Sequence, residues 1–170
     1  MNKKNEEYFD PLTGIFSRKY FEEQLTKELV RASRYQHYLS ILLVDIDDFE
    51  RVNDDFGDQV GDQVLRDVSR IMSENVRVVD VVARYEDDKF TVILPETRKN
   101  EARRTADRIV NNVRKYDFFK DSLKIRELSV SIGIASFPED AGKAFDMIKK
   151  AQTALLKAKR AGGSKVMLSE

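Results

Sequence analysis

The sequence of 170 residues contains no cysteine, no tryptophan, one histidine, three prolines and seven glycines. Without cysteine the chain has no disulfide, no thiolate nucleophile and no cysteine-ligated metal. It does not need such cross-links, because a domain of this length buries about 70% of its unfolded surface on folding. No proline- or glycine-rich linker divides the chain, and we expect one globular domain.

The sequence also lacks an excess of charge of either sign, because 30 Lys and Arg balance 30 Asp and Glu. A net charge of zero argues against general nucleic-acid binding. No apolar run approaches the ~18 residues of a membrane span, and the charged start has no apolar signal-peptide core. We therefore expect a cytoplasmic protein with no nucleic-acid and no membrane partner.

Four segments have the apolar spacing of amphipathic helices. In residues 17–35, Phe21, Leu25 and Leu29 recur at helical spacing, and Ser17 is a suitable N-cap. The other three are 59–75, the strongly basic 99–115, and 143–163, which ends in two glycines.

Five segments have the pattern of strands. The apolar run YLSILLVDID ends in carboxylates, which indicates a buried central strand. DVVARY and KFTVILP are separated by the acidic tip EDD and predict a hairpin. LSVSIGIASFP and SKVMLS add two further strands, the last of them an edge strand. The order of helices and strands predicts an α+β fold with a largely antiparallel sheet covered by helices.

Two carboxylates stand where predicted strands end. Asp45 ends the central strand and Asp88 lies at the hairpin tip, so the two can bring hard oxygen ligands to one magnesium ion. The alternative is that acidic residues only cap strands and solvate loops. That alternative is favoured for Asp47, Asp48, Asp54 and Asp55.

Five blocks in order over residues 10–167 resemble the GGDEF domain, the diguanylate cyclase family. They read DPLTGIFSRKYF, DIDDFERVNDDFGDQVGD, RYEDDKF, SVSIGIASFP and ALLKAKRAGGSKV. The resemblance implies a five-stranded, mostly antiparallel sheet wrapped by helices, similar to nucleotidyl cyclases and polymerase palms. It makes residues 10–170 the domain, and residues 1–9 resemble the tail of a linker helix.

The resemblance also assigns roles to matching residues. It implies that Asp45 and Asp88 are magnesium ligands, that Asn53 and Asp62 read the guanine of GTP, and that Lys159 contacts the phosphates. An amide and a carboxylate suit guanine, whose N1 and N2 donors need acceptors.

The family signature Gly-Gly-Asp/Glu-Glu-Phe is replaced here by Glu86, Asp87, Asp88, Lys89 and Phe90. Two glycines that allow close approach to a phosphorylated ligand are missing, and two carboxylates would repel a triphosphate. Lys89 cannot ligate magnesium, but it can form a salt bridge with Asp45 or Asp88. We therefore predict an inactive cyclase with no cofactor, and with Mg²⁺ only if cyclase activity remains. Asp45 and Asp88 are then vestigial metal residues, and Asn53, Asp62 and Lys159 are vestigial GTP-binding residues.

A second motif, Arg77-Val-Val-Asp80, is separated from the signature by the five residues 81–85, which is the spacing of the family's RxxD inhibitory site for cyclic di-GMP. Guanine offers O6 and N7 acceptors to an arginine, and N1 and N2 donors to a carboxylate. Arg104 and Arg108, one helical turn apart, match the family's arginine contact to the same ligand. The alternative is that the basic residues of this segment only form a solvated surface, and this is sufficient to explain Arg98 and Lys99.

These observations predict a cyclic di-GMP receptor that is catalytically inactive. Two alternatives stay open: a weak diguanylate cyclase, and an interaction module that binds GTP or no nucleotide. The expected partners are cyclic di-GMP, a second copy of the chain joined through a stacked ligand dimer, and an unknown upstream sensory or downstream output protein.

Overall fold

The structure is a computed structural model that describes residues 7–120, 123–124 and 128–170. Within these ranges a sheet of six strands has the order β1-β3-β4-β2-β7-β8. Its strands are β1 (Phe16–Ser17), β2 (Leu39–Ile46), β3 (Val81–Glu86), β4 (Lys89–Pro95), β7 (Val130–Phe137) and β8 (Val166–Leu168). The helices are α2 (Arg18–Tyr35), α3 (Phe49–Phe56), α4 (Asp58–Glu74), α5 (Lys99–Lys115) and α6 (Ala144–Arg160). Strands β5 (Phe119–Lys120) and β6 (Leu123–Lys124) form a separate small sheet.

Strand β2 lies at the centre of the six-stranded sheet, and all eight of its residues are buried. It pairs antiparallel with β4 and β7, and β3 pairs antiparallel with β4. Each edge strand runs parallel to its neighbour: β1 pairs with β3, and β8 pairs with β7. The predicted α+β class and mostly antiparallel sheet are confirmed, but the predicted count of five strands is wrong. The additional strand is β1, whose two residues are too few to show the alternation by which strands are predicted.

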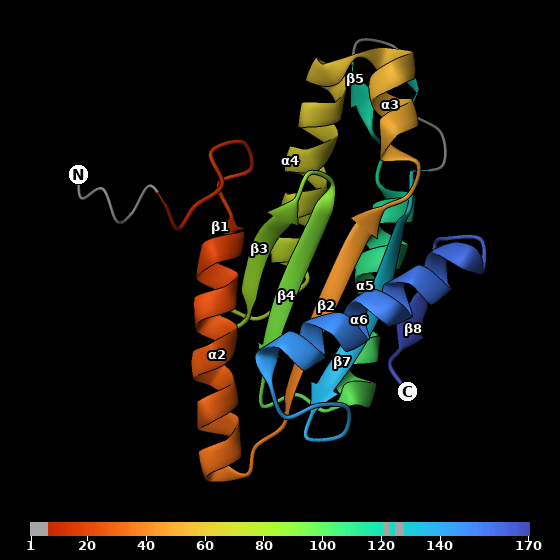
Figure 1. Ribbon diagram of the computed structural model, residues 1–170. Coiled ribbons are helices and arrows are strands. Elements are labelled where there is room, and N and C mark those ends of the chain that lie inside the picture. The colour runs from red at the N-terminus through yellow and green to blue at the C-terminus, as the bar shows by residue number, and fades with distance from the viewer. Residues whose placement is uncertain (1–6, 121–122, 125–127) are drawn as a thin grey trace.

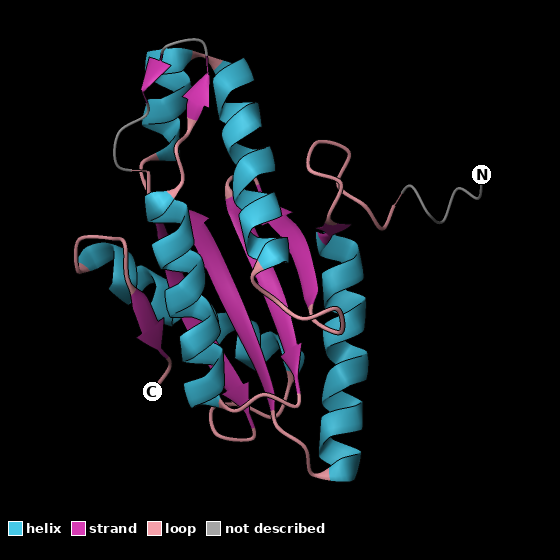
Figure 2. Cartoon of the chain, turned by 180° about the vertical axis from the view of Figure 1, so that it is seen from behind, coloured by secondary structure: helices cyan, strands magenta, loops and turns pink. Residues whose placement is uncertain are grey.

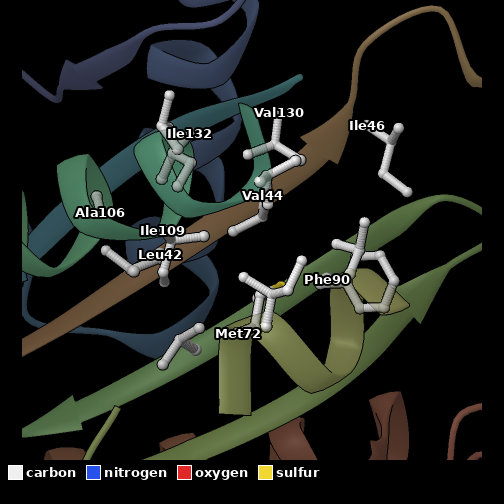
Figure 3. Packing of buried hydrophobic residues seen from close by; sticks show 14 of the residues in the cluster. Leu42, Val44, Ile46, Met72, Phe90, Ala106, Ile109, Val130 and Ile132 are labelled. Carbon is white, nitrogen blue, oxygen red and sulfur yellow. The ribbon is translucent and has the colours of Figure 1, made fainter. Parts of the chain in front are cut away.

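Both faces of the sheet are covered by helices, because successive residues of β2 point to opposite sides. Leu42 and Val44 pack on one side against α4 and α5, where Figure 3 shows Met72 and Ile109 beside them. Leu43 packs on the other side against α2 and α6. Figure 1 shows α6 crossing the sheet in front, and Figure 2 shows α4 and α5 on the opposite face.

The four predicted helices are present with small shifts at their ends. Helix α2 begins after Ser17, whose hydroxyl oxygen accepts a hydrogen bond from the N–H of Tyr20 at 3.4 Å, as its N-cap role predicts. Helix α3 was not predicted. Phe49, Val52 and Phe56 have helical spacing, but a helix of eight mostly polar residues gives only a short pattern. It places Asn53 beyond the end of β2.

The expected linker-helix tail covers residues 1–9, of which residues 1–6 lie outside the described residues. Phe9 forms an isolated antiparallel bridge with Phe16, and its ring stacks on the Phe16 ring. In the described ranges, no helix combines the length and the apolar character needed to cross a membrane.

Candidate functional site

The end of β2 and the β3–β4 hairpin bring the predicted metal carboxylates together. Asp45 is 6% exposed and pairs in register with Lys89 of β4. Asp88 lies in the two-residue turn, where its main-chain carbonyl accepts a hydrogen bond from the N–H of Ile46 at 3.3 Å. Its charge acts on Asp45, so the sequence pairing of the two carboxylates corresponds to proximity in the structure.

Lys159 of α6 forms an ion pair with the buried Asp45 carboxylate. Burial raises the pKa of Asp45; the hydrogen bond from Lys159 lowers it, and the nearby Asp88 charge raises it. The ammonium of Lys89 lies 4.0 Å from Asp88 Oδ1, so of its two expected partners the ion pair forms with Asp88. The Lys159 ammonium, which the resemblance assigned to substrate phosphates, contacts Asp45 in this structure.

This arrangement does not fit a magnesium ion without rearrangement. The Asp45 carboxylate is already neutralised by Lys159, and an ammonium near the site repels a divalent cation. Neighbouring Asp47 offers no replacement, since its oxygens accept hydrogen bonds from Ser129 (2.6 Å), Ser131 (2.7 Å) and the Ser164 N–H (2.9 Å). Among the residues that the structure describes, no group of three or more His, Cys, Asp or Glu side chains could hold a metal ion.

A hollow of 420 Å³ opens beside this cluster, and Asp88 and Lys159 both line it. Asn53 and Asp62, the predicted guanine readers, lie on the successive helices α3 and α4 and do not line the hollow. Asn53 packs against Gly61, where an added Cβ would lie 1.8 Å from the Asn53 Oδ1. The structure thus brings together the metal and phosphate positions and leaves the guanine positions outside this hollow.

The signature turn keeps its tight geometry although its glycines are absent. Asp87 has a φ of 22°, a conformation that favours glycine. Arg84 holds this residue in place by donating hydrogen bonds to the Asp87 carbonyl at 2.8 and 3.0 Å. Glu86 is held by Arg18, whose Nη1 lies 2.8 Å from Glu86 Oε1. Phe90 follows the turn and is fully buried in the core.

The second predicted site lies at the opposite end of the same hairpin. The Asp80 carboxylate, 2% exposed, accepts hydrogen bonds from the Arg77 main-chain N–H at 2.7 Å and from Arg77 Nη2 at 2.8 Å. Arg77 Nη2 also donates to the Pro95 carbonyl (2.9 Å) and to Thr97 Oγ1 (2.8 Å). The bonds to Asp80 raise the pKa of Arg77, whose side chain is 55% exposed.

A hollow of 230 Å³ lies over this pair and is lined by Arg77, Asp80, Thr97 and Arg108 among others. Arg108 Nη2 donates to the Asn75 carbonyl at 2.6 Å, which draws α5 toward the end of α4. The structure therefore brings three of the four predicted ligand contacts together. The fourth, Arg104, is exposed and does not line the hollow.

Thr97 is the site residue that the sequence did not indicate. It lies two residues after β4 ends and is 6% exposed. Its hydroxyl donates to the Pro95 carbonyl at 2.9 Å and accepts from Arg77. No local pattern identifies it, since its role depends on a guanidinium 20 residues away in the chain.

The fold, the position of the signature turn and the match to a family model all indicate one protein family. The family model described as "Diguanylate cyclase, GGDEF domain" matches residues 7–165, and the chain belongs to this family. Among its relatives, diguanylate cyclase DosC of Escherichia coli K12 is 36% identical over 166 residues, which cover 97% of this chain and 36% of DosC. Response regulator PleD of Caulobacter vibrioides is 33% identical over 159 residues, 93% of this chain and 35% of PleD. The chain thus spans little more than a third of the length of these curated relatives.

Solved GGDEF structures match the fold closely. The GGDEF domain of YfiN (TpbB) from Pseudomonas aeruginosa has a TM-score of 0.89 and 31% identity, with 93% of this chain and 98% of that chain covered. The GGDEF domain of DgcB from Caulobacter crescentus, solved in complex with c-di-GMP, has a TM-score of 0.90 and 28% identity, with 96% and 93% covered.

Proposed function

We propose that this domain is a cyclic di-GMP receptor that binds the ligand at the Arg77 and Asp80 site and is inactive as a cyclase. The observation that carries the proposal is the guanidinium of Arg77, fixed by Asp80 above a hollow that Arg108 also lines. Arg77 Nε and Nη2 contact Asp80, whereas its Nη1 has no hydrogen-bond partner in the described ranges. Glu96 and Glu101 also line the hollow, and their charges act on the Arg77 guanidinium.

The chemistry of the ligand matches this site. Guanine presents two acceptors, O6 and N7, to an arginine, and a phosphate is bound by a second guanidinium. Because Asp80 already orients Arg77, little side-chain entropy is lost when the ligand binds. One such contact pair with phosphate contacts and stacking supports a Kd of about 1 μM.

Isothermal titration calorimetry with cyclic di-GMP tests the proposal. Arg77→Ala should weaken binding at least about tenfold, because a hydrogen bond to a charged group contributes about 1.5–3 kcal/mol. Arg103→Ala is the matched control, since this exposed arginine on α5 does not line the hollow and forms an ion pair with Asp107. Equal affinity of Arg77→Ala and wild type would refute the receptor assignment.

The proposed loss of catalysis rests on the other end of the hairpin. Lys159 pairs with the Asp45 carboxylate, Lys89 stands at the fourth signature position, and Glu86 and Asp87 add negative charge at the turn. Lys89, Glu86 and Asp87 are departures from the signature, and each weakens the binding of magnesium or of a triphosphate. Lys159 matches the family, and it is its pairing with Asp45 that opposes a metal ion at this carboxylate. The chain should therefore produce no cyclic di-GMP from GTP and Mg²⁺ above the level of an Asp45→Ala, Lys89→Ala control.

A weak diguanylate cyclase is the second candidate, favoured by the presence of Asp45, Asn53, Asp62 and Asp88 at matching positions and by relatives named as cyclases. If the chain forms cyclic di-GMP and Asp45→Ala abolishes this activity, the cyclase assignment is established.

The third candidate is an interaction module that uses GTP or no nucleotide. Stabilisation by GTP, without stabilisation by cyclic di-GMP, would favour its GTP-binding form.

A further inference from the structure

A third hollow, away from both sites described above, lies between α6 and the segment after β8. It has a volume of 490 Å³ and shares no lining residue with the hollows at Arg77 and at Asp88. Figure 1 shows α6 and β8 near each other, close to the C-terminus. Its volume lies in the range of small-molecule pockets, about 300–1,000 Å³.

Positive charge gathers on the α6 side of this hollow. Lys149, Lys150 and Lys157 line it, and Lys150 and Lys157 stand two turns apart on one face of the helix. Both ammoniums converge on Glu170: Lys157 Nζ lies 2.8 Å from the Glu170 Oε2, and Lys150 Nζ donates to the Glu170 main-chain oxygen. The two lysines already hold oxygen atoms in this position.

The Glu170 carboxylate is a weakly held occupant. Its side chain is 87% exposed and that of Lys157 is 49% exposed, and ion pairs exposed to this extent contribute little to stability. The hydrogen bond from Lys157 lowers the pKa of Glu170, so the carboxylate is charged at neutral pH. A ligand with more negative charge can therefore displace it.

The wall opposite α6 carries an unpartnered donor. Ser169 is 7% exposed, its hydroxyl oxygen has no hydrogen-bond partner in the described ranges, and it lines the hollow. A buried hydroxyl without a partner is unfavourable unless a ligand or water satisfies it. Among the described residues, three carboxylates also line the hollow. Asp140 is 3% exposed and bound to Lys99 at 2.6 Å, so its charge is compensated, whereas Asp146 is exposed in the first turn of α6 and adds a negative charge to that of Glu170.

We infer that this hollow binds the phosphate or diphosphate group of a small molecule, with Lys150 and Lys157 as the cationic contacts, Ser169 as a hydroxyl donor and Glu170 as an internal competitor. Lysine ammoniums are compact charges that suit phosphate, and three of them border one wall. Ala141, Ala154 and Leu168 supply an apolar surface for the rest of the ligand. This site is independent of the proposed cyclic di-GMP site.

Titration of the ¹⁵N-labelled chain with inorganic pyrophosphate at constant ionic strength tests the inference. The amide signals of 146–157 and of 166–170 should shift in a saturable manner, and the double variant Lys150→Ala, Lys157→Ala should abolish saturation. The double variant Lys27→Ala, Lys115→Ala, which removes two exposed lysines of α2 and α5, should bind as wild type does.

Glu170→Gln provides a prediction of opposite sign. Removal of the internal carboxylate should tighten pyrophosphate binding about threefold, the effect of one exposed ion pair. Absence of saturable shifts in the wild type, wild-type binding by the Lys150 and Lys157 double variant, or unchanged affinity in Glu170→Gln would each overturn the inference. All substituted side chains are exposed, so unchanged thermal unfolding midpoints should show that the variants are folded.

Discussion

At the scale of single residues, the ion pair between Lys159 and Asp45 joins helix α6 to the central strand. The Asp45 carboxylate is buried at the end of β2, and a buried charge is unfavourable unless it is paired. Lys159 supplies that pair from α6, so one contact neutralises the site and links a helix to the central strand. The pair that we propose to oppose metal binding thereby also supports the fold.

Lys159→Met should destabilise the chain by about 1–3 kcal/mol, because it leaves the Asp45 carboxylate buried without its main partner. In an Asp45→Asn background the same substitution should cost clearly less, since no buried charge remains. Urea unfolding of the four proteins measures both values. Equal costs in the two backgrounds would show that the ion pair does not carry the effect.

The loss of stability caused by Lys159→Met should depend on pH. Burial raises the pKa of Asp45, so above its unfolded pKa the native state binds more protons than the unfolded state, and stability falls as pH rises. Removing Lys159 takes away the interaction that lowers this pKa. The destabilisation by Lys159→Met should therefore be smaller at about pH 4 than at about pH 7, which urea unfolding at the two pH values measures. A cost that is independent of pH would contradict this account.

Thr97 is the corresponding single residue at the ligand site. Its hydroxyl accepts from Arg77 Nη2 and is buried, so it positions the guanidinium that we propose to contact guanine. Thr97→Val keeps the shape and removes the hydroxyl, and it should weaken cyclic di-GMP binding several-fold, about 1 kcal/mol. Thr153→Val, an exposed threonine on α6 away from this site, is the control for calorimetry. Unchanged affinity of Thr97→Val would exclude the positioning role.

At the scale of helices and strands, periodic patterns predicted most of the fold. β2 was predictable because its apolar residues are continuous, and α2 because Phe21, Leu25 and Leu29 are spaced by one turn. β1 was missed because two residues give no period. α3 was missed because its helical spacing of Phe49, Val52 and Phe56 covers only eight residues. The candidate site shows the same limit: motif residues such as Arg77 were identifiable, whereas Thr97 and the Lys159–Asp45 pair depend on contacts between distant elements.

The contact of α6 with β7 yields a prediction about one glycine. A Cβ at Gly133 would lie 2.1 Å from the Ala151 carbonyl oxygen and 2.4 Å from the Leu155 nitrogen, both backbone atoms of α6. Gly133→Ala should therefore push the helix off the strand and cost about 3 kcal/mol, the upper range for overpacking. Gly142→Ala meets nothing within 4 Å and should be neutral or slightly stabilising. Urea unfolding compares the two, and equal stability would contradict the close approach.

At the scale of the whole molecule, the β3–β4 hairpin separates the signature turn from the proposed cyclic di-GMP site. Asp88 lies at its tip, and Arg77 contacts Pro95 at the other end of β4. β4 has seven residues, whose six steps of about 3.3 Å put about 20 Å between these ends, so changes in the signature turn leave the Arg77 contacts in place. This separation explains how one chain can carry an altered signature and the complete set of Arg77 contacts.

Ligand-dependent stability tests the molecule as a whole. Cyclic di-GMP at a hundred times its Kd should stabilise the fold by about 2.7 kcal/mol, since it binds the native state alone. For a chain of this size that corresponds to a rise in Tm of roughly 5–10 °C. The rise should be the same with Mg²⁺ and with EDTA, because the Arg77 site uses no metal, and it should be absent in Arg77→Ala.

Size-exclusion chromatography of the same samples should show a larger species with ligand if a stacked ligand dimer joins two chains. A shift produced by GTP and Mg²⁺ instead, and retained in Arg77→Ala, would move ligand binding to the Asp45 end of the hairpin and overturn the receptor assignment.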